Sequence, residues 1–371
     1  MSAQPNITDQ GTLSAGSIHP ESPKTKKKLI RRTDADRSQQ LRRYFQIAFL
    51  VLNAYVGVLF YMWVRHFESA GATRFVERPA GVEGWLPIAA LMNLKYLVLT
   101  GHVPSIHPAG MFLLVAFLGI SLVFRKSFCS WLCPIGTISE YLWKLGRRTF
   151  RRNFSLPRWA DIPLRGLKYL LLGFFVYVIG AMSVEAIAEF LSAPYGLIAD
   201  VKMLNFFRFM STTAAVVVGV IIVLSFFVQN FWCRYLCPYG ALMGLAALFS
   251  PARIHRNAEP CIDCGKCAKA CPSQLPVDKL VQIRSAECTA CLECVAVCPA
   301  EGALQIAVGV PLIAPKPQRR LSPVALAAGI ALVFLGLVGF AKTAGYWDTD
   351  IPRDLYMQLV PSANQASHPG L

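Results

Sequence analysis

The chain is poor in charged side chains and in histidine. Only 16% of its 371 residues are charged, 54% are hydrophobic and six are histidine. Soluble domains carry about 25% charged residues, so the deficit excludes an ordinary soluble protein. No histidine falls in the middle of a long apolar run, which argues against a haem held by two histidines inside a membrane. No G-x-G-x-x-G turn opens a βαβ unit, so a dinucleotide cofactor is not expected either.

The apolar residues gather in five long runs that are almost free of charge. Each has about the length that a membrane-spanning helix needs, near 20 residues. The runs cover residues 45–64, 107–124, 167–184, 212–228 and 321–341. The sequence therefore predicts an α-helical integral membrane protein with about five transmembrane helices.

The net charge of +16 is unevenly distributed. Most lysines and arginines lie in the first 44 residues, between the second and third runs, or between the fourth and fifth runs. Cytoplasmic loops carry such an excess, so residues 1–44 are expected to form a disordered basic cytoplasmic arm. The same rule places the C-terminal tail outside the cytoplasm. These charges favour contact with membrane lipid rather than with nucleic acid.

Eight of the 12 cysteines fall in two runs of the form C-x2-C-x2-C-x3-C-P. This is the bacterial ferredoxin spacing for two [4Fe–4S] clusters, in which the fourth cysteine of each run ligates the other cluster. One cluster is therefore expected on Cys261, Cys264, Cys267 and Cys298. The other is expected on Cys288, Cys291, Cys294 and Cys271.

Zinc is the main alternative for these two runs, since paired C-x2-C motifs also bind Zn²⁺. Zinc ribbons seldom double a run of three cysteines followed by a fourth and a proline. Disulfides are disfavoured because every cysteine falls in a segment expected to face the reducing cytoplasm. Residues 253–255 and 303–306 have the pattern of short flanking strands, so a small α+β two-cluster ferredoxin-like module is expected over residues 251–311.

The remaining cysteines form two C-x3-C-P motifs, at the cytoplasmic ends of the second and fourth runs. They are Cys129 and Cys133, and Cys233 and Cys237. Their recurrence predicts an internal repeat, with residues 45–150 and 151–250 as first and second membrane repeats. Cysteines four apart share a helix face, and the proline that follows would end or kink that helix. Together the four thiols would bind a further iron–sulfur cluster or another metal, unless they are only small buried side chains.

With these two kinds of motif, residues 45–310 resemble the polyferredoxin-type membrane iron–sulfur proteins of the NapH/NosR type, the membrane components of quinol dehydrogenases. The resemblance implies a multi-pass protein of the bacterial cytoplasmic membrane, with a periplasmic C-terminal tail. It also implies electron relay between the quinol pool, or a cytoplasmic donor, and a respiratory or periplasmic redox partner. Two alternatives stay open, namely an assembly factor that uses the C-x3-C-P thiols and an oxidant-sensing regulator.

A quinol site is expected on the external side, where both halves carry an interrupted apolar segment, at residues 85–100 and 191–210. The candidate proton acceptors near these segments are His102, His107, Glu185 and Glu189. Polar residues at helix ends commonly contact only water and lipid head groups, so each also has an explanation without a ligand. Residues 312–371 are expected to supply the fifth transmembrane helix and a short external tail.

Overall fold

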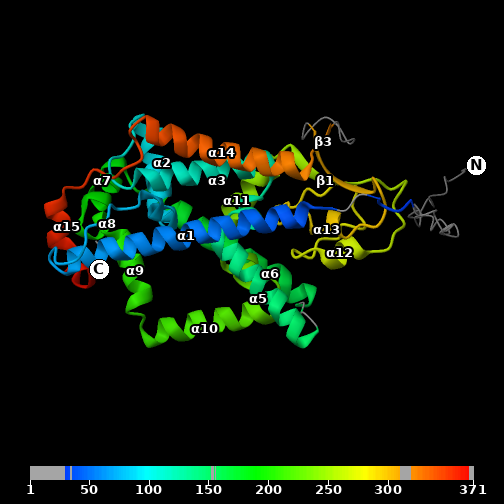
Figure 1. Cartoon of the computed structure of the whole chain (residues 1–371), viewed down its shortest axis with the longest axis horizontal. Coiled ribbons are helices and arrows are strands. Elements are labelled where there is room, and N and C mark those ends of the chain that lie inside the picture. The colour runs from blue at the N-terminus through cyan, green and yellow to red at the C-terminus, as the bar shows by residue number, and fades with distance from the viewer. Residues whose placement is uncertain (1–29, 34–35, 152–153, 155, 310–318, 367–371) are drawn as a thin grey trace, which may run out of the picture.

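The computed structural model describes residues 30–33, 36–151, 154, 156–309 and 319–366. Helices α1 (Ser38–Glu68), α3 (Pro108–Phe124) and α14 (Pro323–Thr343) run along the long axis of the molecule (Figure 1). The ferredoxin-like module lies at one end of this axis, and α15 (Arg353–Leu359) lies at the other with the short η3 (Ala363–Gln365).

Helices form at all five apolar runs, the remaining two being α6 (Arg158–Ala181) and α10 (Thr212–Phe227). In the described part of the chain, α1, α6 and α14 are long and apolar enough to cross a membrane alone. A fourth span results if α9 (Ala199–Arg208) and α10 are counted as one helix bent by 81°. The protein is thus a mostly helical membrane protein with three to four candidate spans, and the count of five stays a prediction because α3 has only 17 residues.

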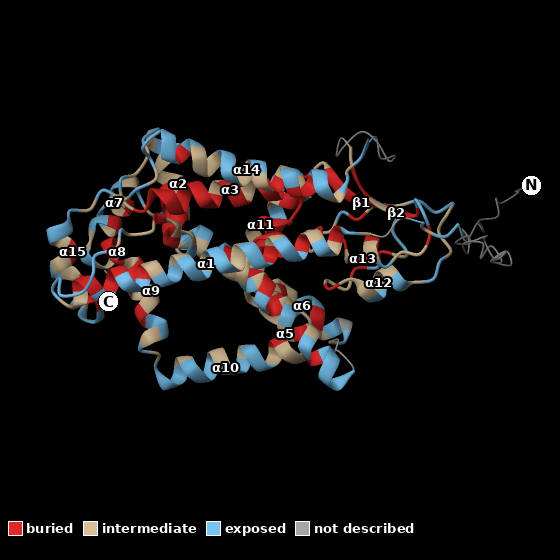
Figure 2. Cartoon of the chain, viewed as in Figure 1, coloured by how far each residue is buried: buried red, intermediate tan, exposed pale blue. Residues whose placement is uncertain are grey.

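The outer helices expose large apolar side chains along their length, as helices that face lipid do (Figure 2). Val216, Val217 and Val220 on α10 are each more than half exposed, whereas α3 is buried over most of its length. Serine caps begin several of these helices. Ser322 accepts a hydrogen bond from the Ala325 amide at 3.1 Å, directly before Pro323 at the first position of α14.

Both expected interrupted segments lie at the end opposite the module, and the second is broken into short helices (Figure 1). The first segment, residues 85–100, forms the single helix α2 (Pro87–Thr100), which follows η1 (Ala80–Trp85). The second forms α7 (Val184–Ser192), α8 (Pro194–Leu197) and α9. Helix α2 packs against α7, so the two segments meet in space.

Each C-x3-C-P motif forms a junction between two helices. In the first motif α4 (Phe128–Trp131) leads into α5 (Pro134–Phe150), and in the second the π-helical η2 (Trp232–Leu236) leads into α11 (Pro238–Leu248). The expectation that both cysteines of a motif share one helix is corrected here. The break comes before each proline, which begins the next helix because it lacks an amide donor and has a helical φ.

The ferredoxin-like module is built on a small antiparallel sheet. Strands β1 (Ala252–Arg256) and β2 (Leu304–Val308) pair with Ile254 opposite Ile306, and β3 (Arg319–Arg320) extends the sheet beside β2. The two expected strands are thereby confirmed. Two short helices, α12 (Lys266–Ala270) and α13 (Glu293–Ala296), each contain the third cysteine of a run.

The module and the membrane helices share one apolar core. Buried Phe117 on α3, Trp131 on α4 and Met243 on α11 belong to the same cluster as Ile254 and Ile306 of the sheet. Contiguous packing of this kind fixes the module relative to the membrane helices.

The expected disordered arm of residues 1–44 is corrected where the structure describes it. Helix α1 begins at Ser38, and residues 30–33 lie against the module, where the Arg32 amide donates to the Pro299 carbonyl at 3.0 Å. These backbone contacts explain why the segment is ordered despite its charge. Residues 1–29 and 34–35 lie outside the described residues, as do residues 310–318, which contain the expected end of the module.

Candidate iron–sulfur sites

The structure gathers the eight ferredoxin-type cysteines into two small pockets. The first pocket is lined by Cys261, Cys264, Cys267 and Cys298. The second is lined by Cys271, Cys288, Cys291 and Cys294. This grouping has the crossed pattern expected from the spacing, while ligation of a cluster stays a prediction.

Left-handed residues let each loop wrap around its pocket. Gly265 has φ +66° just before α12, and Leu292 has φ 60° just before α13. Each therefore turns the backbone between the second and third cysteines of its run. The second pocket is the deeper one, since Cys288 and Cys294 are buried whereas Cys264 of the first is exposed.

Within the described residues, no group of three or more His, Cys, Asp or Glu side chains is arranged to hold a metal ion. A single zinc ion would draw its ligands to about 2.0–2.3 Å from one centre. A cluster instead spreads its thiolates over four iron corners. The two pockets each supply the four cysteines that a [4Fe–4S] cluster needs.

The four cysteines of the C-x3-C-P motifs meet at the inner end of one large cavity. The two motifs have matching local geometry. The Cys133 sulfur accepts from the Gly136 amide at 3.4 Å, and the Cys237 sulfur accepts from the Gly240 amide at 3.3 Å. Burial raises the pKa of Cys129 to about 11 and that of Cys133 to about 12. A bound metal would need these cysteines as thiolates, so binding would release their protons.

The second ferredoxin pocket lies directly against the first C-x3-C-P motif. The Ser130 hydroxyl donates to the Thr289 carbonyl at 2.6 Å, and the Trp131 indole donates to the Ala290 carbonyl at 3.2 Å. Both carbonyls belong to the loop that leads to Cys291. The loop is thus held by the residues between Cys129 and Cys133.

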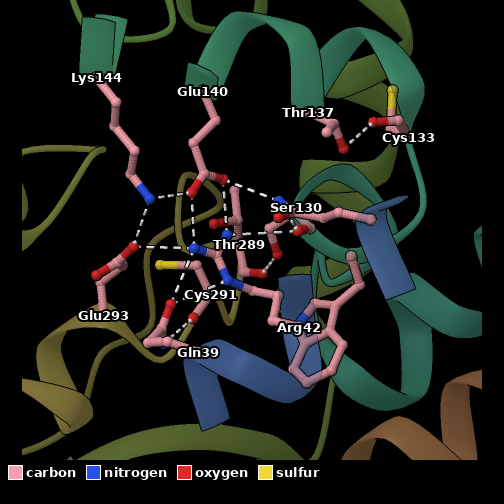
Figure 3. Close-up of polar contacts among 12 residues, drawn as sticks. Gln39, Arg42, Ser130, Cys133, Thr137, Glu140, Lys144, Thr289, Cys291 and Glu293 are labelled. Carbon is pink, nitrogen blue, oxygen red and sulfur yellow. Dashed lines mark hydrogen bonds and ion pairs between the residues drawn. The ribbon is translucent and has the colours of Figure 1, made fainter. Parts of the chain in front are cut away.

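A buried ion-pair network at the start of α1 secures the same loop (Figure 3). Arg42 is 3% exposed and contacts both carboxylate oxygens of Glu140 at 2.7 Å and Glu293 at 2.9 Å. Lys144 completes the network with contacts to both carboxylates. Gln39, one turn before Arg42, donates to the Cys291 carbonyl at 2.9 Å. Helices α1 and α5 are therefore tied to α13 beside the second pocket.

The large cavity has a volume of about 1380 Å³ and extends from the four membrane cysteines to the opposite end of the helices. Its apolar wall comes from α1, α2, α3, α6 and α14. Leu172 and Phe175 on α6 and Val338 on α14 are among the lining residues. At the far end the lining becomes polar, with Arg78 and Asp348. The volume and lining suit a lipophilic molecule of cofactor size.

The four candidate proton acceptors do not line this cavity. His102, Glu185 and Glu189 are exposed. His107 is buried, and its ring nitrogens lie 3.3 Å from Glu83 and 2.9 Å from the Gly196 carbonyl. These contacts give His107 a structural explanation.

A buried network behind His107 closes the end of the structure opposite the module. Arg78 contacts Glu83 at 2.9 Å and Asp200 at 2.7 Å, joining η1 to α9. Burial would raise the pKa of Glu83, but Arg78 and His107 outweigh it and hold that pKa at about 2. Thr349 also donates to Glu83, so the C-terminal segment is fastened to the same carboxylate.

The residues that join the module to the membrane helices carry little signal in the sequence. Arg42, Glu140 and Glu293 are far apart in the chain, and each resembles an ordinary charged residue of a cytoplasmic loop. The only local hint is position, since Glu287 and Glu293 each directly precede a cysteine.

Comparison with family models assigns iron–sulfur chemistry to the same segments. A model described as a 4Fe-4S binding domain matches residues 106–153 and again residues 210–257, which contain the two C-x3-C-P motifs. A model described as a 4Fe-4S dicluster domain matches residues 253–299. The chain therefore contains 4Fe–4S domains both at the membrane motifs and at the ferredoxin-type runs.

Similar proteins are associated with electron transport. The Escherichia coli K12 protein YccM, to which electron transport is ascribed, is 50% identical over 327 residues, covering 88% of this chain and 91% of YccM. The ferredoxin-type protein NapH of the same organism is 28% identical over 268 residues, covering 70% of this chain and 85% of NapH. The regulatory protein NosR of Pseudomonas aeruginosa is 32% identical over 193 residues, which are half of this chain but 25% of NosR. No solved structure matches the chain.

Fold, cysteine sites and relatives together define a membrane protein of electron transport that contains 4Fe–4S domains. The chain belongs to the NapH/NosR-type polyferredoxin family.

Proposed function

We propose that this protein relays electrons between the quinol pool, or a cytoplasmic donor, and a respiratory or periplasmic redox partner. Clusters held by its cysteines would supply one-electron transfer. The first would be held by Cys261, Cys264, Cys267 and Cys298, and the second by Cys288, Cys291, Cys294 and Cys271. A third iron–sulfur group would be held by Cys129, Cys133, Cys233 and Cys237.

The observation that carries this proposal is the contact between the second ferredoxin pocket and the membrane cysteine set. The first pocket has the exposed Cys264, the second lies against α4, and the membrane set opens into the cavity. Cys291 lines both the second pocket and the cavity wall, so those two sets adjoin. Hydrogen bonds from Ser130, Trp131 and Gln39 keep the second pocket in place.

We assign the cavity to the quinol. A quinol is largely apolar with a polar head, and the cavity joins an apolar wall to thiols at one end and to Arg78 at the other. The charge pattern of the loops supports a cytoplasmic module and a periplasmic α15. Five spans arise if α3 and the bent α9–α10 pair each cross the membrane.

Anaerobic purification with iron and sulfide counting, together with EPR of the reduced protein, tests the cluster assignment. Three [4Fe–4S] clusters predict about 12 irons per chain, and two predict about eight. The double variant Cys133→Ser, Cys237→Ser should lose the membrane group and keep both ferredoxin signals. Stoichiometric zinc without an EPR signal would refute the assignment. Alkylation of all four membrane thiols in fully loaded wild-type protein would instead favour an assembly factor.

A bulky substitution tests the quinol assignment. Leu172→Trp places a larger side chain into the cavity and should abolish reduction of the clusters by a quinol analogue, while dithionite still reduces them. Leu170→Trp on the same helix is the matched control, because Leu170 is 72% exposed. Equal rates of quinol-driven reduction in both variants would refute the assignment of the quinol to this cavity.

A further inference from the structure

Buried cations lie beside the four membrane cysteines. Lys126 lies between α3 and α4 and is 4% exposed, and Lys168 on α6 is fully buried. Both face Glu287 of the module. The Lys168 ammonium lies 2.6 Å from each oxygen of that carboxylate, whereas the Lys126 ammonium lies 3.8 Å from the nearer one. Glu287 is therefore paired closely with Lys168 and only loosely with Lys126.

The second membrane motif adds another buried cation. Arg234 lies between Cys233 and Cys237 and donates twice to Asp161 at 3.0 Å. Asp161 also pairs with Arg165. One nitrogen of the Arg234 guanidinium, Nη1, is buried without a hydrogen-bond partner in the part of the chain that the structure describes. The charged side chains around the membrane thiols are thus richer in cations than in carboxylates.

An excess of buried positive charge is costly unless an anion compensates it. Asp161 and Glu287 are the carboxylates that the structure pairs with these cations. Four thiolates around an iron–sulfur group would add further anions, because each carries a negative charge. The surroundings of the four cysteines are therefore suited to an anionic metal–thiolate group, as the donor set already indicates.

Lys126 lies beside the thiol of the second motif. A methyl group added at Gly240 would lie 3.6 Å from the Lys126 ammonium and also 3.6 Å from the Cys237 sulfur. The ammonium and the sulfur thus approach the same point in the cavity. Lys126 also lines that cavity together with Cys129, Cys133 and Cys233.

We propose that Lys126 raises the reduction potential of the group held by Cys129, Cys133, Cys233 and Cys237. The inference rests on the proposed function, since it requires that group. Adding one electron makes the group more negative by one charge, and a fixed ammonium in a buried site stabilises that charge. Lys126 is in this sense a tuning residue, which acts on the group without ligating it.

An EPR-monitored redox titration of Lys126→Met tests the proposal. The equilibrium constant for one-electron reduction of the membrane group should fall at least tenfold, which is a shift of 59 mV to lower potential. Lys126→Arg keeps the charge and should keep the potential near that of the wild type. Lys144→Met is the matched control, because Lys144 also joins the membrane helices to the module but binds Glu140 and Glu293.

The outcomes separate this inference from the proposed function. If the wild type shows no third EPR signal and only about eight irons, the membrane group itself is refuted. If the third signal is present and Lys126→Met leaves its potential unchanged, the tuning role of Lys126 is refuted. An equal shift in Lys126→Met and Lys144→Met would also refute it, since the effect would then come from docking of the module.

Discussion

Arg42 should be the charged residue on which attachment of the module depends most. Its guanidinium contacts Glu140 and Glu293 and is 3% exposed, so Arg42→Gln leaves two carboxylates with Lys144 as their remaining cation in the network (Figure 3). Breaking a buried ion pair by removing one partner costs about 3–5 kcal/mol. The contacts that hold the Cys291 loop should loosen in the same variant.

The pKa of Glu140 gives a second measure of this cost. Burial would raise that pKa, but Arg42 and then Lys144 outweigh it and lower it from 4.5 to about 2. A pKa change of one corresponds to about 1.4 kcal/mol, so the lowered pKa of Glu140 corresponds to about 3 kcal/mol of folding stability. Because the folded-state pKa is depressed, this stability is present above pH 4.5 and is lost as the pH falls toward 2.

Equilibrium denaturation in detergent micelles at neutral pH, followed by tryptophan fluorescence, measures the loss. Arg43→Gln is the matched control, since Arg43 is the next residue on α1 and is exposed, and it should change the free energy of unfolding by less than about 0.5 kcal/mol. A double-mutant cycle of Arg42→Gln with Glu140→Gln isolates their coupling. Equal stability of the Arg42→Gln and Arg43→Gln variants would refute the reasoning.

Three further predictions concern the cysteine sites and the outer end. Cys298→Ala should abolish the EPR signal of the first ferredoxin cluster and keep that of the second, and loss of the second alone would refute crossed ligation. Gly136→Ala should destabilise the protein by about 1–3 kcal/mol in thermal unfolding, because its methyl would overlap the Cys129 carbonyl, whereas Gly240→Ala has room. Glu83→Ala should lower the free energy of unfolding by about 3–5 kcal/mol, because it removes a buried partner of Arg78. Glu189→Ala, at an exposed position, should lower it by less than about 0.5 kcal/mol. Equal losses in the two variants would contradict the role of the buried network.

Features that depend on local spacing along the chain, such as the cysteine motifs and the apolar runs, were predictable from the sequence. Cysteine spacing identifies iron–sulfur motifs because one loop must wrap around one cluster. Apolar runs identify helices because a span needs about 20 residues. The strands around Ile254 and Ile306 were found for the same kind of reason, since they flank the cysteine runs.

The quinol candidates show where this reasoning fails. His107 is a candidate proton acceptor because of its position at a helix end. Its burial against Glu83 depends on η1 folding back over α3. The cavity itself has no sequence pattern, because its wall combines side chains from five helices. A local pattern does not contain such contacts.

The sequence by itself determined the class of chemistry, the membrane helices and the grouping of the cysteines into sets, since these follow from spacing and hydrophobic length. Only the tertiary structure decided how the sets are ordered. It places the second ferredoxin pocket against α4 through Ser130 and Trp131, and it buries Arg42 and Lys126 at that contact. The physical reason is that these contacts join segments separated by more than a hundred residues, where packing and charge pairing act through space.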